Sequence, residues 1–86
     1  MKTMTAANGR EQAKLSAAIN AAQGAIYSAC PAELAYSTPL SGCRVYASPE
    51  QLAAEAAANS ALWDWERRMA SEGRGWINPR GHFTFY

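Results

Sequence analysis

The most constraining feature of the sequence is the tetrapeptide Ser48-Pro49-Glu50-Gln51, which carries three helix-start signals in four residues. A serine at the N-cap accepts a hydrogen bond from the helix backbone, proline suits the first helical position, and glutamine at the third position completes a capping box. The next glycine along the chain is Gly73, and glycine is the residue that most often ends a helix. The sequence therefore predicts one helix from Pro49 to about Glu72.

Another helix is predicted upstream, from Asn8 to the residues before Pro31. Asn8 has the side chain of an N-cap, and Glu11 lies three residues after it, as in a capping box. Residues 1–7 precede this signal and are expected to be flexible. Apolar side chains then recur at three- and four-residue steps, the period of an amphipathic helix: Leu15, Ala18, Ile19, Ala22, Ala25, Ile26 and Ala29.

Two shorter segments carry strand signals. Cys43–Ala47 contains β-forming side chains and alternates weakly between apolar and polar residues, so we predict a strand there. Asn78-Pro79-Arg80-Gly81 has the residue preferences of a type I turn, and its flanks are rich in β-formers, which predicts a hairpin over residues 76–86.

The predicted fold class is α+β, in the order α-β-α-β-β. Two Ala-rich helices would pack on a small three-stranded antiparallel sheet, in a single domain of residues 1–86.

The composition predicts a thin core. Nineteen of the 86 residues are alanine, whereas leucine, isoleucine, valine and phenylalanine together number eleven. A domain of this size buries a modest share of its surface, so closely packed helices and a few large aromatic side chains must supply the core. We therefore expect the chain to form a homodimer or a tight complex with another protein.

Charge and hydropathy exclude several classes of protein. The net charge is +1, without the basic excess that is typical of proteins that wrap nucleic acid. The sequence has no run of about 18 apolar residues, and its first residues lack the apolar core of a signal peptide. We expect a cytoplasmic protein that does not bind a membrane.

Groups for catalysis or metal binding are scarce. His82 is the single histidine, and the sequence has neither a serine nucleophile elbow nor a phosphate-binding glycine loop. Cys30, Cys43 and His82 supply three ligands at most, whereas structural zinc sites use four. Glu55 and Glu66 are interpreted as parts of a solvated strip on the second long helix, not as an acid–base pair. We expect no enzymatic activity, no cofactor and no metal.

Cys30 and Cys43 bracket a proline-containing loop. In a reducing cytosol such thiols stay free, which favours two buried cysteines. A disulfide across the same span is the alternative that the sequence leaves open.

Trp63 and Trp65 cannot both face one seam of the second long helix, because residues two positions apart point about 200° away from each other. Trp65 is expected in the core. Its broad apolar face also carries Ala54, Ala58, Leu62 and Met69. Trp63 is expected to contact a partner at the surface, beside Arg67. Its narrower face also carries Leu52, Ala56 and Ala70.

Arginine and aromatic side chains are interleaved over the last quarter of the chain. Such residues are enriched at protein interfaces, but they can also form a core, or stack on nucleobases and contact phosphates. Acidic neighbours such as Asp64 and Glu72 weaken the nucleic-acid interpretation. The candidate partner-binding residues are Trp63, Arg67, Arg74, Trp76 and Arg80.

The predicted function is therefore that of a small, non-enzymatic protein-interaction module. In its general style, the small Ala-rich chain resembles the accessory proteins of phages and other mobile elements, which often occupy a surface of a host protein. That resemblance implies an inhibitor or adaptor. The alternative is a nucleic-acid-binding accessory protein that uses the arginine and aromatic residues of the C-terminal segment.

Overall fold

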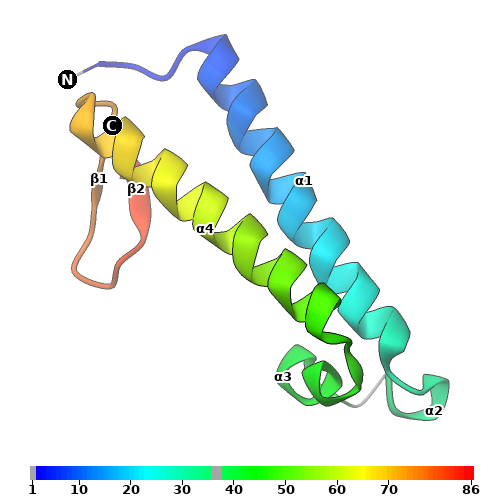
Figure 1. Cartoon of the computed structure of the whole chain (residues 1–86). Coiled ribbons are helices and arrows are strands. Elements are labelled where there is room, and N and C mark those ends of the chain that lie inside the picture. Colours follow the sequence, from blue (N-terminus) through cyan, green and yellow to red (C-terminus); the bar gives the residue numbers. More distant parts are fainter. Residues whose placement is uncertain (1, 36–37) are drawn as a thin grey trace.

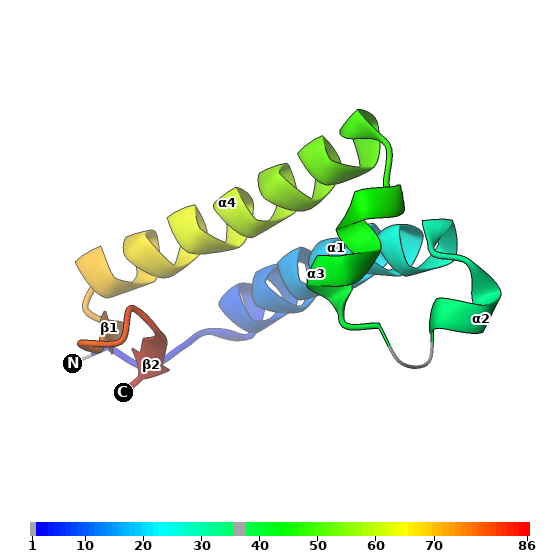
Figure 2. The same cartoon turned by 90° about the horizontal axis from the view of Figure 1, so that it is seen from below.

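Two long helices form the body of the protein: α1 (Ala6–Ala29) and α4 (Pro49–Ser71). The computed structural model describes residues 2–35 and 38–86. The two helices run antiparallel and side by side along most of their length (Figures 1 and 2). The molecule is correspondingly elongated, with extents of 49 × 26 × 21 Å.

Both long helices begin at a capping box. At α4 the prediction is confirmed, because the Ser48 hydroxyl accepts from the backbone of Gln51 and the Gln51 side chain accepts from the backbone of Ser48. At α1 the predicted N-cap was three residues late. Thr5 is the N-cap and its partner is Asn8, which lies at the third helical position instead of preceding the helix.

The predicted strand over Cys43–Ala47 is wrong. In the described part of the connection between α1 and α4, the chain forms three short helical segments: α2 (Ala32–Ala35), α3 (Leu40–Cys43) and the 3-10 helix η1 (Arg44–Tyr46). Pro39 precedes α3, and its carbonyl accepts from the backbone of Gly42 and Cys43, which closes a helical turn. The alternation of apolar and polar residues was weak, and packing against the long helices decides this segment instead.

The sheet within the described residues is a two-stranded antiparallel hairpin, so the predicted third strand is not part of it. Strand β1 (Gly75–Ile77) pairs with β2 (Phe83–Phe85), with Trp76 opposite Thr84. The predicted turn is confirmed. The Gly81 backbone donates to the Asn78 carbonyl at 2.8 Å, and Gly81 has a φ of +83°, a conformation that glycine adopts without strain. The fold is therefore α+β, with the hairpin at the C-terminal end.

The core is divided between the two ends of the helix pair. At one end Ile26, Cys30 and Cys43 are buried together, with Leu40, Ala47 and Leu52 packed around them. At the other end Trp65 and Met69 of α4 are buried, and Phe83 of the hairpin packs edge-on against Trp65. The α3 segment and the hairpin thus brace opposite ends of the same two helices (Figures 1 and 2).

No helix in the described ranges combines the length and the apolarity that crossing a bilayer requires.

Candidate protein-interaction surface

Trp63 and Arg67 lie one turn apart on α4 and contact each other. The guanidinium carbon of Arg67 is 5.1 Å from the centroid of the Trp63 ring, within the range of a cation–π interaction. The Trp63 side chain is nevertheless 38% exposed. The structure therefore brings these two predicted site residues together and leaves a large aromatic ring accessible beside a positive charge.

The hairpin turn borders the same ring. A Cβ atom added at Gly81 would lie 3.8 Å from Cη2 of Trp63. Arg80 precedes Gly81 in the turn and is exposed, and its backbone N–H donates to the Asn78 side chain at 2.9 Å. The Trp63 ring is thus held between a neighbouring arginine on its own helix and a fixed turn of the hairpin.

Trp65, in contrast to Trp63, is buried. It is 2% exposed, and its ring meets Phe83 at a centroid distance of 5.9 Å; Phe83 in turn meets Phe85 at 5.0 Å. The prediction that Trp65 is a core residue is confirmed. Its indole N–H is buried and has no hydrogen-bond partner among the described residues.

Trp76 points away from α4. Neighbouring residues of a strand face opposite sides of a sheet, so Trp76 and its partner Thr84 share the face opposite to that of Ile77 and Phe83. Phe83 packs on Trp65, which places the Trp76 ring on the outer, exposed face of the hairpin.

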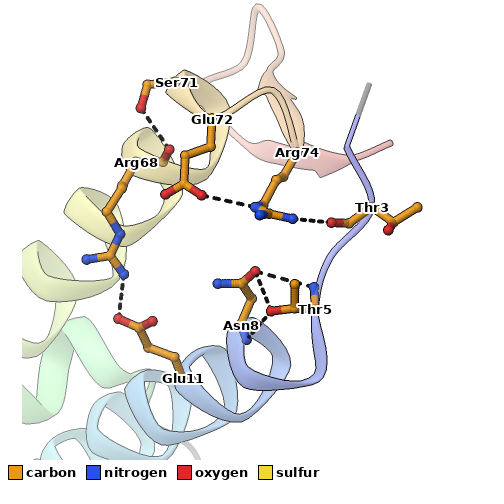
Figure 3. A network of polar contacts seen from close by, with 8 residues as sticks. All are labelled: Thr3, Thr5, Asn8, Glu11, Arg68, Ser71, Glu72 and Arg74. Carbon is orange, nitrogen blue, oxygen red and sulfur yellow. Dashed lines mark hydrogen bonds and ion pairs between the residues drawn. The ribbon is translucent and has the colours of Figure 1, made fainter.

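Arg74 is not a free surface charge. It lies at the base of the hairpin, where Nε donates to Glu72 at 3.0 Å and a terminal nitrogen donates to the Thr3 carbonyl (Figure 3). The Lys2 backbone also donates to the Gly73 carbonyl at 3.0 Å. These contacts attach the N-terminal segment to the hairpin, and they assign Arg74 a structural role in addition to the predicted one. The flexibility expected for residues 1–7 stays a prediction.

Arg68 is also paired. Its guanidinium donates to Glu11 of α1 at 2.5 Å, across the two long helices. Two of the four arginines in the C-terminal segment, Arg68 and Arg74, therefore have acidic partners.

The solvated-strip interpretation of Glu55 is wrong. Glu55 is 6% exposed, and both of its oxygens accept from Arg44 of η1, each at 2.8 Å. The hydrogen bond from Arg44 lowers the pKa of Glu55 below its ordinary value, against the opposing effect of burial, and Gln23 contributes a further hydrogen bond. No spacing in the sequence marks this pair, because the two residues are on separate elements.

The pKa of Glu66 is shifted in the other direction, upward. Partial burial raises the pKa of Glu66, and the Phe83 backbone and His82 offset this in part. Two carboxyls with divergent pKa values can perform acid–base chemistry when they face one substrate. Glu55 and Glu66 are eleven residues apart on one helix, which separates them by about 16 Å at the rise of an α-helix. They do not share a site.

The remaining chemical groups are dispersed. Cys30 and Cys43 are buried at the α3 end, whereas His82 follows the hairpin turn, so the three do not meet. Within the described residues no three histidine, cysteine or acidic side chains are grouped as metal ligands.

A cavity of about 310 Å³ lies between the start of α1 and the end of the chain. Its lining residues are Met4, Gly9, Gln12, Phe85 and Tyr86. The side chains there offer one amide and one phenol hydroxyl as polar groups, and the rest of that lining is apolar.

Comparison with known protein families, with curated proteins and with solved structures finds no match in any of the three.

Proposed function

We propose that this protein is a small, non-enzymatic protein-interaction module that acts in the cytoplasm as an inhibitor or adaptor. Its binding surface comprises Trp63 and Arg67 of α4 and Arg80 of the adjacent turn, and Trp76 on the outer face of the hairpin supplies a separate contact. One observation carries the proposal: the Trp63 ring is accessible to solvent although Arg67 and the turn at Gly81 hold it in place.

A fixed, exposed tryptophan has the properties of an interface hot spot. Tryptophan and arginine dominate binding energy at protein interfaces, mainly through large contact areas that exclude water. The neighbouring Arg67 and the turn reduce the rotamer freedom of the ring before binding, so less conformational entropy is lost when a partner covers it.

The elongated shape of the chain also supports the proposal that it binds a partner. The chain exposes 5673 Å², whereas a compact monomer of 9.3 kDa exposes about 5000 Å². Its radius of gyration is 15.6 Å, against about 12 Å for a compact domain of this length. The surplus of about 700 Å² approaches what one partner contributes to an interface of standard size. A second copy of the chain or another protein would cover such a surface.

The nucleic-acid alternative is less well supported by the same geometry. Ion pairing of Arg68 with Glu11 and of Arg74 with Glu72 leaves fewer arginines to neutralise phosphates. Phosphate contacts dominate nucleic-acid affinity, and they make that affinity fall steeply with salt.

The proposal can be tested by affinity capture from a lysate of the native host, followed by measurement of binding to the captured protein once it is purified. Three baits are compared: the wild-type chain, Trp63→Ala, and Tyr46→Ala. Tyr46 is an exposed aromatic residue of η1, at the other end of the helix pair, and serves as the matched control.

We expect the wild type and Tyr46→Ala to bind the purified protein equally, and Trp63→Ala to bind at least about 30-fold more weakly, as for loss of a hot spot. Capture should survive nuclease treatment and should change little between low and high salt. Equal binding by Trp63→Ala would show that the surface lies elsewhere. Loss of capture on nuclease treatment would favour the nucleic-acid alternative.

A further inference from the structure

Two cysteines are buried next to each other at the end of the molecule opposite the proposed binding surface. Cys30 is the C-cap residue that directly follows α1, and Cys43 is the last residue of α3. Their exposed fractions are 6% and 0%, and they form one buried cluster with Ile26. Both are free thiols in this structure.

The two thiols are close enough to influence each other. Burial raises the pKa of the Cys30 thiol, and the neighbouring Cys43 thiol raises it further. The Sγ atom of Cys43 also lies 3.8 Å from the Thr38 carbonyl, which it contacts as a weak donor. Cys43 is fully buried in the same cluster as Cys30, so its thiol does not face solvent.

We propose that Cys30 and Cys43 are a redox-active pair that low-molecular-weight disulfides oxidise to an intramolecular disulfide. The pair differs from a lone buried cysteine because both thiols belong to one buried cluster, so the second thiol is nearby to resolve a mixed disulfide. This modification site goes beyond the proposed binding function and does not depend on it.

The reaction balances in two exchange steps. The thiolate of one cysteine attacks a sulfur of the small disulfide, which forms a mixed disulfide and releases one small thiolate that takes up a proton. The thiolate of the other cysteine then attacks the protein sulfur of the mixed disulfide and releases the second small thiol. In total, two protein thiols lose two electrons and two protons, and the small disulfide is reduced to two thiols.

The new disulfide would fix the corner between α1 and α4, that is, the buried cluster of Ile26, Cys30 and Cys43. It would close the loop of residues 31–42 and tie the end of α1 to the residue that precedes Arg44, whose side chain pairs with Glu55 on α4. A crosslink across a loop of this length restricts the unfolded chain, so the oxidised form should melt roughly 10–20 °C above the reduced form.

Burial also sets the rate. The thiolate is the attacking species, and burial disfavours it at Cys30. Oxidation should therefore be slow at pH 7 and should become faster as the pH is raised toward 9, for as long as the fold persists.

The test uses the full chain and oxidised glutathione as the probe, with intact mass and thermal unfolding as readouts. We expect the wild type to lose two hydrogen masses while remaining a monomeric chain on a non-reducing gel, and its Tm to rise. Cys30→Ser and Cys43→Ser should each stop at the glutathione adduct. Cys30→Ala and Cys43→Ala repeat these controls without placing a hydroxyl in the core.

Three outcomes would overturn the proposal. The wild type could stay fully reduced after prolonged incubation at pH 8.5, it could accumulate a stable glutathione adduct, or it could form only disulfides between chains. A disulfide-linked monomer that melts no higher than the reduced protein would also contradict the proposed geometry, because the bond would then strain the corner instead of fitting it.

Discussion

Arg44 covers Glu55: a partly exposed guanidinium on the 3-10 helix η1 binds both oxygens of a carboxylate that is buried in the first half of α4. This contact joins the short helical connection to the long helix that carries the proposed binding surface. Because the Glu55 carboxylate is buried away from water, its negative charge depends on Arg44 for stabilisation.

Arg44→Met should destabilise the protein, because it leaves the Glu55 carboxylate buried without its cation. We expect Tm to fall by several degrees, and the double substitution Arg44→Met with Glu55→Met to recover most of the loss. Arg10→Met, which changes an exposed arginine of α1, serves as the control. Thermal unfolding followed by circular dichroism measures all four chains. A double variant as unstable as Arg44→Met would show that the ion pair is not the cause.

Lowering the pH should reduce the unfolding free energy of the protein through the pair of Arg44 and Glu55. The pKa of Glu55 is lower in the folded chain than its ordinary value of 4.5, mainly because of the hydrogen bond from Arg44. The contribution of the pair is therefore fully present above pH 4.5 and is lost as the pH falls through the lower, folded pKa. Urea unfolding between pH 3 and pH 7 should show a steeper acid loss for the wild type than for the double variant. Equal slopes would contradict this assignment.

Glu66 should have the opposite dependence. Its pKa is raised in the folded chain, chiefly by burial, so its favourable contribution is present below pH 4.5 and is lost as the pH rises through the folded pKa. Glu66→Gln removes the charge that burial disfavours and should be more stable than the wild type at pH 7, with a smaller difference at pH 4. Urea midpoints at the two pH values test this, and a less stable Glu66→Gln at pH 7 would argue against it.

Local signals in the sequence predicted the features that are determined locally. Ser48 and Gln51 meet as the capping box requires, and Asn78 and Gly81 close the turn, because each pair is only three residues apart and its geometry is set by the backbone between them. The burial of Trp65 also followed from the pattern along one helix, where it shares the broader apolar face with Leu62 and Met69. These predictions needed no knowledge of how distant segments pack.

Contacts between distant segments could not be predicted in the same way. Arg44 and Glu55 are eleven residues apart on different elements, and nothing in either local pattern indicates that one will bury the other. The segment 43–47 has weak preferences of its own, so packing at the end of the long helices determines its conformation. For the candidate surface, spacing along α4 predicted the contact of Trp63 with Arg67, whereas the contact of Arg74 with the Thr3 carbonyl depends on how segments far apart in the sequence meet.

Two glycines should respond in opposite ways to alanine. Gly24 lies within α1 with open space around the added Cβ, so Gly24→Ala should stabilise the protein by about 0.5–1 kcal/mol through its better helix propensity. At Gly75 a Cβ would overlap the Phe83 ring and the Thr84 carbonyl, so Gly75→Ala should destabilise the hairpin. Urea unfolding of both variants measures the two signs. Stabilisation by Gly75→Ala would show that the hairpin does not pack as described.

The two neighbouring tryptophans give the sharpest separation of fold from binding. Trp65→Ala removes a ring that is buried against Phe83 and should cost about 3–5 kcal/mol of unfolding free energy, which would leave this small domain largely unfolded. Trp63→Ala removes an exposed ring and should change the unfolding free energy by less than about 1 kcal/mol, while weakening partner binding or self-association by about 2 kcal/mol or more.

Urea unfolding followed by circular dichroism measures the first effect, and sedimentation velocity over a range of concentrations measures self-association. Arg67→Ala provides an internal check, because it keeps the Trp63 ring but removes the cation that lies 5.1 Å from its centroid. It should weaken association less than Trp63→Ala does and should leave the fold intact, since the pair is exposed. If Trp63→Ala unfolds the protein as readily as Trp65→Ala, both rings belong to the core, because an exposed anchor can be removed without loss of the helix pair that presents it.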